Sequence, residues 1–416
     1  MSNKMKTKGR IADDQPALLP KLRFPEFRGT AGWGLTPLDL ACQMRAGKFV
    51  SASEIRELSE QGLYPCYGGN GLRGYTATFT HSGKYSLIGR QGALCGNVKQ
   101  GIGQFHATEH AIVVTPKNGV AGDWLFFILD FLNLNRFATG QAQPGLSVDV
   151  LEKLSIGVPM RETEQQKIAD CLSSLDELIG AQARKVDALK THKKGLMQQL
   201  FPREGETQPR LRFPEFQNSS AWGEVALREI AEIKLGKMLD KQKHRTGNLL
   251  PYLNNLSVRW NDVNTSNLPQ MYFDDRELER FGLNAGDVVV CEGGEPGRAA
   301  VWDGNLPDLK FQKAIHRVRF NVPFEPKLLV LHLENLAGTT QFEMLFTGGG
   351  IKHLTGETFS RLKIPLIPYA EQQRIANCLT TLDDLITAAT QKLDTLKTHK
   401  KGLMQQLFPT AEAVGV

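Results

Sequence analysis

The chain has 416 residues, which is room for two or three domains that each bury a core. Its apolar runs are too short for a membrane span, and its six separated cysteines lack the spacing of a zinc knuckle or a disulfide framework. A net charge of +6 is compatible with nucleic acid but does not establish it as a partner. Residues 1–19 are polar and lack an apolar signal core, so we predict a mobile tail on a cytoplasmic protein.

Two short blocks open two halves of the sequence. PKLRFPEF at 20–27 returns as PRLRFPEF at 209–216. Other residues keep the same register, namely Trp33-Gly34 with Trp222-Gly223 and Gly47-Lys48 with Gly236-Lys237. The period is far too long for a solenoid, whose units have about 20 to 50 residues. The chain is therefore a tandem duplication.

The middles of the two halves differ from each other. Glycine-rich turns join short β-prone runs in GKYSLIGRQGALCGN at 83–97 and in GDVVVCEGGEPGRAAVW at 286–302. Helical patterns follow at 121–133 and 324–336. Each middle is predicted to be an α/β module, with α+β character, around a twisted, partly antiparallel mixed sheet. Shared ends and divergent middles suggest one scaffold that presents two different recognition surfaces.

The glycine loops are the main candidate binding sites. Arg90 lies on the first loop and Arg298 on the second, and a loop arginine can fork onto a guanine edge or a phosphate. The open alternative is a hairpin turn with a solvated arginine. In the same way, His106, His110 and His316 could be packed or solvated side chains on strands. The candidate DNA contacts are Lys48, Tyr67, Asn70, Arg73, Arg90, Gln91, Asn97, His106, His110, Lys237, Lys241, Lys243, Arg245, Asn255, Arg259, Arg298, Lys313, His316 and Lys352.

Two further loops come just before each half returns to its shared end, QAQPGLS at 141–147 and GGGIKHL at 348–354. Neither they nor the other loops have the G-x-x-x-x-G-K-[ST] spacing of a phosphate-binding loop. No His, Cys and Asp spacing suggests a metal site, and Glu292 with Glu295 is too weak a pair to indicate a nuclease.

Each half ends in a long predicted helix. EQQKIADCLSSLDELI at 164–179 returns as EQQRIANCLTTLDDLI at 371–386, and KTHKKGLMQQLFP occurs at both 190–202 and 397–409. The apolar residues alternate every three and four positions, which predicts a narrow seam that pairs the two helices as a coiled coil. Thirty-odd residues would make a rod of roughly 50 Å that ends at the Phe-Pro pair. The predicted seam residues are Ile168, Leu172, Leu175, Ile179, Val186, Leu189, Ile375, Leu379, Leu382, Ile386, Leu393 and Leu396.

The repeated basic run is interpreted first as a solvated helix face, with a protein or phosphate contact as the alternative. It comprises Lys190, His192, Lys193 and Lys194 in the first copy, and Lys397, His399, Lys400 and Lys401 in the second. The predicted order is a tail at 1–19, modules at 20–160 and 209–368, helices at 161–202 and 369–409, a linker at 203–208 and a tail at 410–416. The fold class is a pseudo-twofold repeat of two α/β modules separated by an antiparallel helix pair.

The LRFPEF openings, the GGNG-to-GRQGALCGN and GDVVV-to-GRAA middles and the EQQ(K/R)IA helices ending in GLMQQLFP resemble the specificity subunit of bacterial Type I restriction–modification systems. The resemblance covers roughly 20 to 409. It implies a non-catalytic subunit with two target-recognition domains, each reading half of a split, asymmetric site in double-stranded DNA. It also implies that the helices set the unread gap and dock two methyltransferase subunits, with restriction subunits joining them.

The resemblance further implies that the chain binds no cofactor itself. S-adenosylmethionine, ATP and Mg²⁺ would serve the partner subunits, which methylate adenine N6, translocate and cleave. Two alternatives stay open at this point. One is a nuclease with dispersed carboxylates, and the other is a coiled-coil scaffold that does not bind DNA.

Overall fold

The structure of the protein is a computed structural model that describes residues 18–140, 144–203, 205–239, 247–350 and 352–409. The chain divides into two units, one of residues 1–183 and 391–416 (unit 1) and one of residues 184–390 (unit 2). The predicted N-terminal tail up to residue 17 and the predicted C-terminal tail lie outside the described residues.

Unit 1 is built on a six-stranded mixed sheet. Its order is β2-β7-β5-β6-β3-β4, in which β3 and β6 are parallel and the other pairs antiparallel, and β1 pairs with β8 apart from it. The strands are β1 (Gly34–Pro37), β2 (Cys42–Ala46), β3 (Tyr64–Gly68), β4 (Gly71–Thr76), β5 (His81–Gly89), β6 (Val98–Ala107), β7 (Ala111–Pro116) and β8 (Ser155–Val158). The short helices are α1 (Leu38–Ala41), α2 (Gly122–Phe131) and α3 (Val148–Glu152).

Unit 2 has a four-stranded sheet β10-β18-β15-β16, a three-stranded sheet β14-β11-β17 and the pairs β12-β13 and β19-β9. The strands are β9 (Gly223–Ala226), β10 (Ala231–Leu235), β11 (Asn248–Leu253), β12 (Val258–Arg259), β13 (Asp262–Val263), β14 (Gln270–Phe273), β15 (Val288–Cys291), β16 (Ala299–Val301), β17 (Lys310–Phe311), β18 (Ile315–Phe320) and β19 (Lys363–Leu366). The short helices are α5 (Leu227–Ile230), α6 (Asp275–Arg280), α7 (Pro326–Leu336), α8 (Thr340–Glu343) and α9 (Gly356–Ser360). The predicted mixed α/β fold is confirmed in both units.

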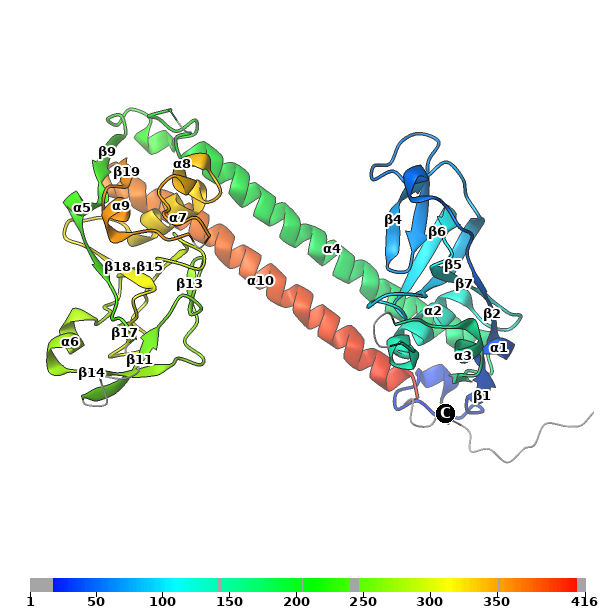
Figure 1. Cartoon of the computed structure of the whole chain (residues 1–416). Coiled ribbons are helices and arrows are strands. Elements are labelled where there is room, and N and C mark those ends of the chain that lie inside the picture. The colour runs from blue at the N-terminus through cyan, green and yellow to red at the C-terminus, as the bar shows by residue number, and fades with distance from the viewer. Residues whose placement is uncertain (1–17, 141–143, 204, 240–246, 351, 410–416) are drawn as a thin grey trace, which may run out of the picture. The chain divides into compact units, whose positions relative to one another are not determined.

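Two long helices take part in both units (green and orange to red in Figure 1). They are α4 (Glu162–Leu200) and α10 (Tyr369–Leu407). The first part of α4 and the last part of α10 belong to unit 1, and their remaining parts belong to unit 2. In unit 1 Lys400 pairs with Asp176 at 2.7 Å, and in unit 2 Lys193 pairs with Asp383 at 2.7 Å. Partner residues that run in opposite order confirm the antiparallel pairing.

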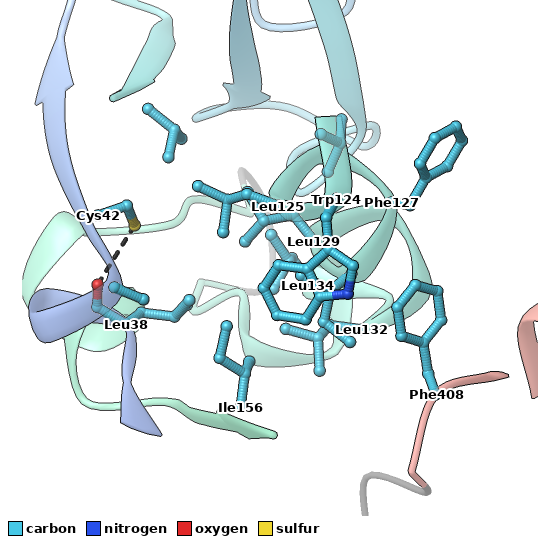
Figure 2. Packing of buried hydrophobic residues seen from close by; sticks show 14 of the residues in the cluster. Leu38, Cys42, Trp124, Leu125, Phe127, Leu129, Leu132, Leu134, Ile156 and Phe408 are labelled. Atoms are coloured by element: carbon cyan, nitrogen blue, oxygen red, sulfur yellow. Dashed lines mark hydrogen bonds between the residues drawn. The ribbon is translucent and has the colours of Figure 1, made fainter. Parts of the chain in front are cut away.

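The repeated Phe-Pro ending of each helix packs into the module of the other half. Phe408, at the end of α10, lies against Trp124 in the core of unit 1 (Figure 2). It also contacts Phe131. Phe201, at the end of α4, contacts Trp222 and His332 in unit 2. The core of each unit therefore includes a phenylalanine from the helix of the other half, Phe408 in unit 1 and Phe201 in unit 2. This shared packing role accounts for a segment that occurs twice.

The repeated openings meet the start of the helices. Arg23, from the first LRFPEF block, and the indole nitrogen of Trp33 both donate to the buried carboxylate of Glu164 at the start of α4. In unit 2 Arg212 and Trp222 make the same bonds to Glu371. The identities in sequence therefore preserve one buried polar cluster in each unit.

The predicted seam residues are all buried or half-buried. Ile168 and Leu172 join the core of unit 1, and Ile375 and Leu379 join the core of unit 2, so the start of each helix packs on its own module. The remaining eight follow them along the helices.

The solvated-face interpretation of the basic run is wrong for one residue of each copy. Lys193 is 6% exposed and lies between Asp383 and Glu334, at 2.7 and 2.9 Å, while Lys400 pairs with Asp176. The other members of the run in α4 are exposed. Among the described residues, no helix is long and apolar enough to cross a membrane.

Candidate nucleic-acid interface

Four loops of unit 1 come together where the strands of its main sheet end. The β5–β6 loop carries Arg90, whose N–H donates to the carbonyl of His110 at 2.9 Å and whose carbonyl accepts from Leu146 at 2.8 Å. Asn97, at the end of the same loop, reaches Asn70 in the β3–β4 turn at 3.4 Å. The loop before α3 joins them, because Gln91 and Thr139 both bridge to Gly145.

Unit 2 gathers four loops in the same way. The β15–β16 loop carries Glu292, whose N–H donates to the carbonyl of Ala314 and whose carbonyl accepts from Leu354, both at 2.8 Å. Arg298, at the end of that loop, donates to the carbonyl of Asn255 at 2.6 Å. The loop before α9 closes the cluster, because Gly293 and Thr347 both bridge to His353.

The two clusters share one backbone frame. In unit 1 Gly89 N–H donates to the carbonyl of Asn97 at 2.9 Å, and in unit 2 Cys291 N–H donates to the carbonyl of Arg298 at 2.8 Å. The residue before the last position is a glycine in both, with φ of 85° at Gly96 and 88° at Gly297. A left-handed backbone at the same place favours glycine in both loops.

The side chains on this frame differ between the units. Arg90 occupies the position of Glu292, and Asn97 occupies the position of Arg298. Asn97 contacts Asn70 in unit 1, and Arg298 contacts Asn255 in unit 2. One frame that carries different donors and acceptors is an arrangement for two related but distinct recognition tasks.

A second pair of shared residues also diverges. At Gly47 a Cβ atom would lie 2.1 Å from the carbonyl oxygen of Ala107, and at Gly236 it would lie 2.3 Å from that of Gln312, so only glycine fits either position. The lysines that follow differ. Lys48 is exposed, whereas Lys237 is buried and pairs with Glu277.

Three predicted DNA contacts are enclosed by the fold, so the candidate surface excludes them. His106 is 5% exposed and is held by Thr78 and the carbonyl of Lys48 at 3.0 Å each. His316 is 0% exposed, bonds the carbonyl of Leu354 at 2.7 Å, and has its pKa lowered by burial. Lys237 is the third, since its ammonium is committed to Glu277 and to the carbonyl of Tyr272.

The remaining predicted residues differ in their exposure and in whether their charged groups are paired. Lys352 is exposed but pairs with Glu343, and Arg298 is committed to Glu295 and Asn255, so Arg298 shapes its loop. Partly exposed predicted side chains are Tyr67, Arg90, Asn97, His110 and Asn255, and exposed ones are Lys48, Asn70, Arg73, Gln91, Arg259 and Lys313. Lys241, Lys243 and Arg245 lie outside the described residues.

Sequence reasoning missed the position of Glu292 in the loop cluster. The pattern invited a comparison of Arg90 with Arg298, because both are arginines on glycine loops. Arg90 and Glu292 both come directly after the first bonded residue of their loops, whereas Arg298 is the last bonded residue, so the backbone frame matches Arg90 with Glu292 instead. The hydrogen-bond register of the neighbouring strands was needed to see this.

The carboxylates in the described parts of the two clusters are not grouped as metal ligands. Across the described ranges, no group of three or more His, Cys, Asp or Glu side chains could hold a metal ion. Glu292 lies 3.8 Å from His353 Nδ1, and Glu295 pairs with Arg298. The two carboxylates therefore have separate partners.

Two α/β units with matching loop frames and different loop side chains define a class of protein with two recognition heads. The sequence model of the Type I restriction modification DNA specificity domain matches residues 33–191 and 219–398. Because the two matches together span most of the chain, the chain belongs to the family of this Type I restriction modification DNA specificity domain.

The chain is similar to several specificity subunits. That of the Type I restriction enzyme EcoprrI of Escherichia coli is 50% identical over 137 residues, which are 33% of this chain and 34% of that protein, so the match spans about a third of this relative. That of MjaVIII from Methanocaldococcus jannaschii is 24% identical over 71% of this chain and 72% of its own.

Solved structures share the fold. A Type I restriction–modification S subunit from M. genitalium aligns with a TM-score of 0.64 and 16% identity, over 94% of this chain and 99% of that one. A chain from a study of complex assembly and conformational transition of the Type I system aligns with a TM-score of 0.54 and 16% identity, over 90% and 97%.

Proposed function

We propose that each unit of this chain reads one half of a bipartite, asymmetric sequence in double-stranded DNA. The observation that carries the proposal is the pair of loop clusters with one backbone frame and different side chains at the Arg90 and Glu292 positions. Side chains on base edges specify sequence, whereas contacts to phosphates position the protein. Exposed Lys48 and Lys313 would provide such phosphate contacts beside the loops.

The long helices would set the gap between the two half-sites. Each has 39 residues, which is about 60 Å of helix at 1.5 Å per residue. Their exposed faces would dock two methyltransferase subunits, which direct methylation of adenine N6, and restriction subunits would complete the nuclease. Support for partners comes from the family and from its solved relative in a study of complex assembly.

The chemistry would belong to the partners. S-adenosylmethionine would serve the methyltransferase subunits, and ATP and Mg²⁺ would serve the restriction subunits, so the chain would act as a non-catalytic reader in the cytoplasm. The alternative is a coiled-coil scaffold that does not bind DNA. The long paired helices, taken alone, are equally consistent with that role.

The test is selection from random double-stranded DNA by this chain assembled with its cognate methyltransferase subunits. The proposal predicts enrichment of two short blocks at a fixed separation and an affinity that falls steeply with salt. Absence of any enriched sequence, together with an affinity insensitive to salt, would favour the scaffold.

A further inference from the structure

We infer that Arg90 and Glu292 are the equivalent base-reading residues of the two units and select opposite base chemistries. Arg90 would read a guanine, which offers two acceptors in the major groove. Glu292 would read a cytosine through its N4 amino group. The inference rests on the proposed function and names the residues that carry it.

The first step is the equivalence of position. Both residues directly follow a central strand of the main sheet, at Gly89 and Cys291. Each donates its backbone N–H to the residue just before a paired neighbouring strand, β7 in unit 1 and β18 in unit 2, and accepts from a residue just before a short helix. Each helix is capped by a hydroxyl, from Ser147 and Thr355. The Cα atoms are therefore held by the same contacts in both units.

The second step is that the functional groups of both side chains are available. Within the described residues, the guanidinium of Arg90 makes one hydrogen bond, a long one of 3.5 Å to the carbonyl of Glu109. Glu292 is 18% exposed, and its nearest ionic partner among the described residues is His353 at 3.8 Å. Two other charged pairs lie on the unit 2 loops, Arg298 with Glu295 and Lys352 with Glu343.

The third step is chemical. A carboxylate close to phosphates is repelled, so on a DNA-reading loop it needs a donor on a base. The N4 amino group of cytosine is the donor that Glu and Asp accept from, while Arg forks onto O6 and N7 of guanine. With a positive Arg90 in unit 1 and a negative Glu292 in unit 2 at the same position of the backbone frame, each unit would select its own half-site.

The experiment is random-site selection by the assembled complex with the wild-type chain and four variants. Glu292→Gln should lower the preference at one position of one half-site by about tenfold or more, because it loses a purely accepting group. Arg90→Gln should do so at one position of the other half-site. Glu357→Gln changes an exposed carboxylate on α9 and should leave both half-sites as in the wild type.

Glu292→Asp guards against a merely structural effect, because it keeps the carboxylate and should keep the preferred base even with weaker binding. Selection of a different base by this variant would overturn the inference. So would a Glu292→Gln motif identical to the wild type, or equal loss at both half-sites. If the wild-type complex selects no bipartite sequence, the proposed function falls too, which separates the two failures.

Discussion

Arg212 donates two hydrogen bonds of 2.7 Å to the two carboxylate oxygens of Glu371, a residue that is completely buried. The pair joins the opening block of unit 2 to the first turn of α10, across 159 residues of sequence. Arg23 and Glu164 form the same pair in unit 1. Removing either group of such a buried bidentate pair is destabilising, because the other group stays buried without its partner.

Replacing Arg212 with Met should therefore destabilise unit 2 by about 3 to 5 kcal/mol, because it leaves the charge of Glu371 buried without its partner. Hydrogen exchange of the amides in β9 and β19, which lie close in sequence to Trp222 and to the start of α10, measures this destabilisation. Arg374→Met is the control, since Arg374 pairs with Glu215 at an exposed site and should cost less than about 1 kcal/mol. Equal protection in both variants would contradict this account.

Lys193 and Lys194 offer a matched comparison on one helix. Lys193→Met removes the buried cation between Asp383 and Glu334 and should lower the free energy of unfolding of unit 2 by about 3 kcal/mol. Lys194→Met removes an exposed charge and should change it by less than about 0.5 kcal/mol. Urea unfolding of the two variants tests this, and indistinguishable midpoints would show that the buried pair does not hold α4 to unit 2.

A seven-residue insertion in both α4 and α10 tests whether the helices act as a spacer. Seven residues add about 10 Å of helix, close to three base pairs of B-DNA. The selected DNA site should keep both half-sites and gain about three base pairs between them. The same insertion after Asn118, in an exposed loop, should leave the gap unchanged. A wild-type gap in the helix variant would refute the spacer role.

His332 should make the stability of unit 2 depend on pH. Burial lowers its pKa to about 4, against about 6.5 in an unfolded chain, so the unfolded state binds the proton first. The free energy of unfolding should therefore fall as pH drops from 6.5 towards 4, by about 2 kcal/mol between pH 7 and pH 5 from this residue.

The measurement is urea unfolding at both pH values for the wild type, His332→Leu and His192→Leu. The His332 variant should lose about 2 kcal/mol less than the wild type on acidification. The exposed His192 should make no difference. The same pH dependence in all three proteins would show that His332 does not carry the effect.

The architecture of two modules and two paired helices was predictable from the sequence because the shared segments occur twice. Repeated residues such as Trp33 and Trp222 marked the shared ends, and the three-four alternation of apolar residues predicted the paired helices. The partner of the repeated lysine was not predictable, because Lys193 stands in an exposed-looking basic run. Its burial depends on Glu334, which comes from a module helix and is not adjacent in sequence.

The candidate site was predictable only as a set of loops. Residue types on the glycine loops pointed to Arg90 and Arg298, yet the backbone frame pairs Arg90 with Glu292. His316 follows a loop that carries candidate contacts, but its strand turns the side chain into the core. Which side chains face outward depends on strand register, and one residue shifts a side chain to the opposite face.

The most direct test of the central claim is a genome-wide map of N6-methyladenine after co-expression of this chain with its cognate methyltransferase subunits. The account predicts one bipartite motif with a fixed gap, and a change in only one half of the motif when the loop cluster of one unit is replaced. No methylated motif from a complex shown to assemble, or a motif unaffected by either replacement, would contradict it.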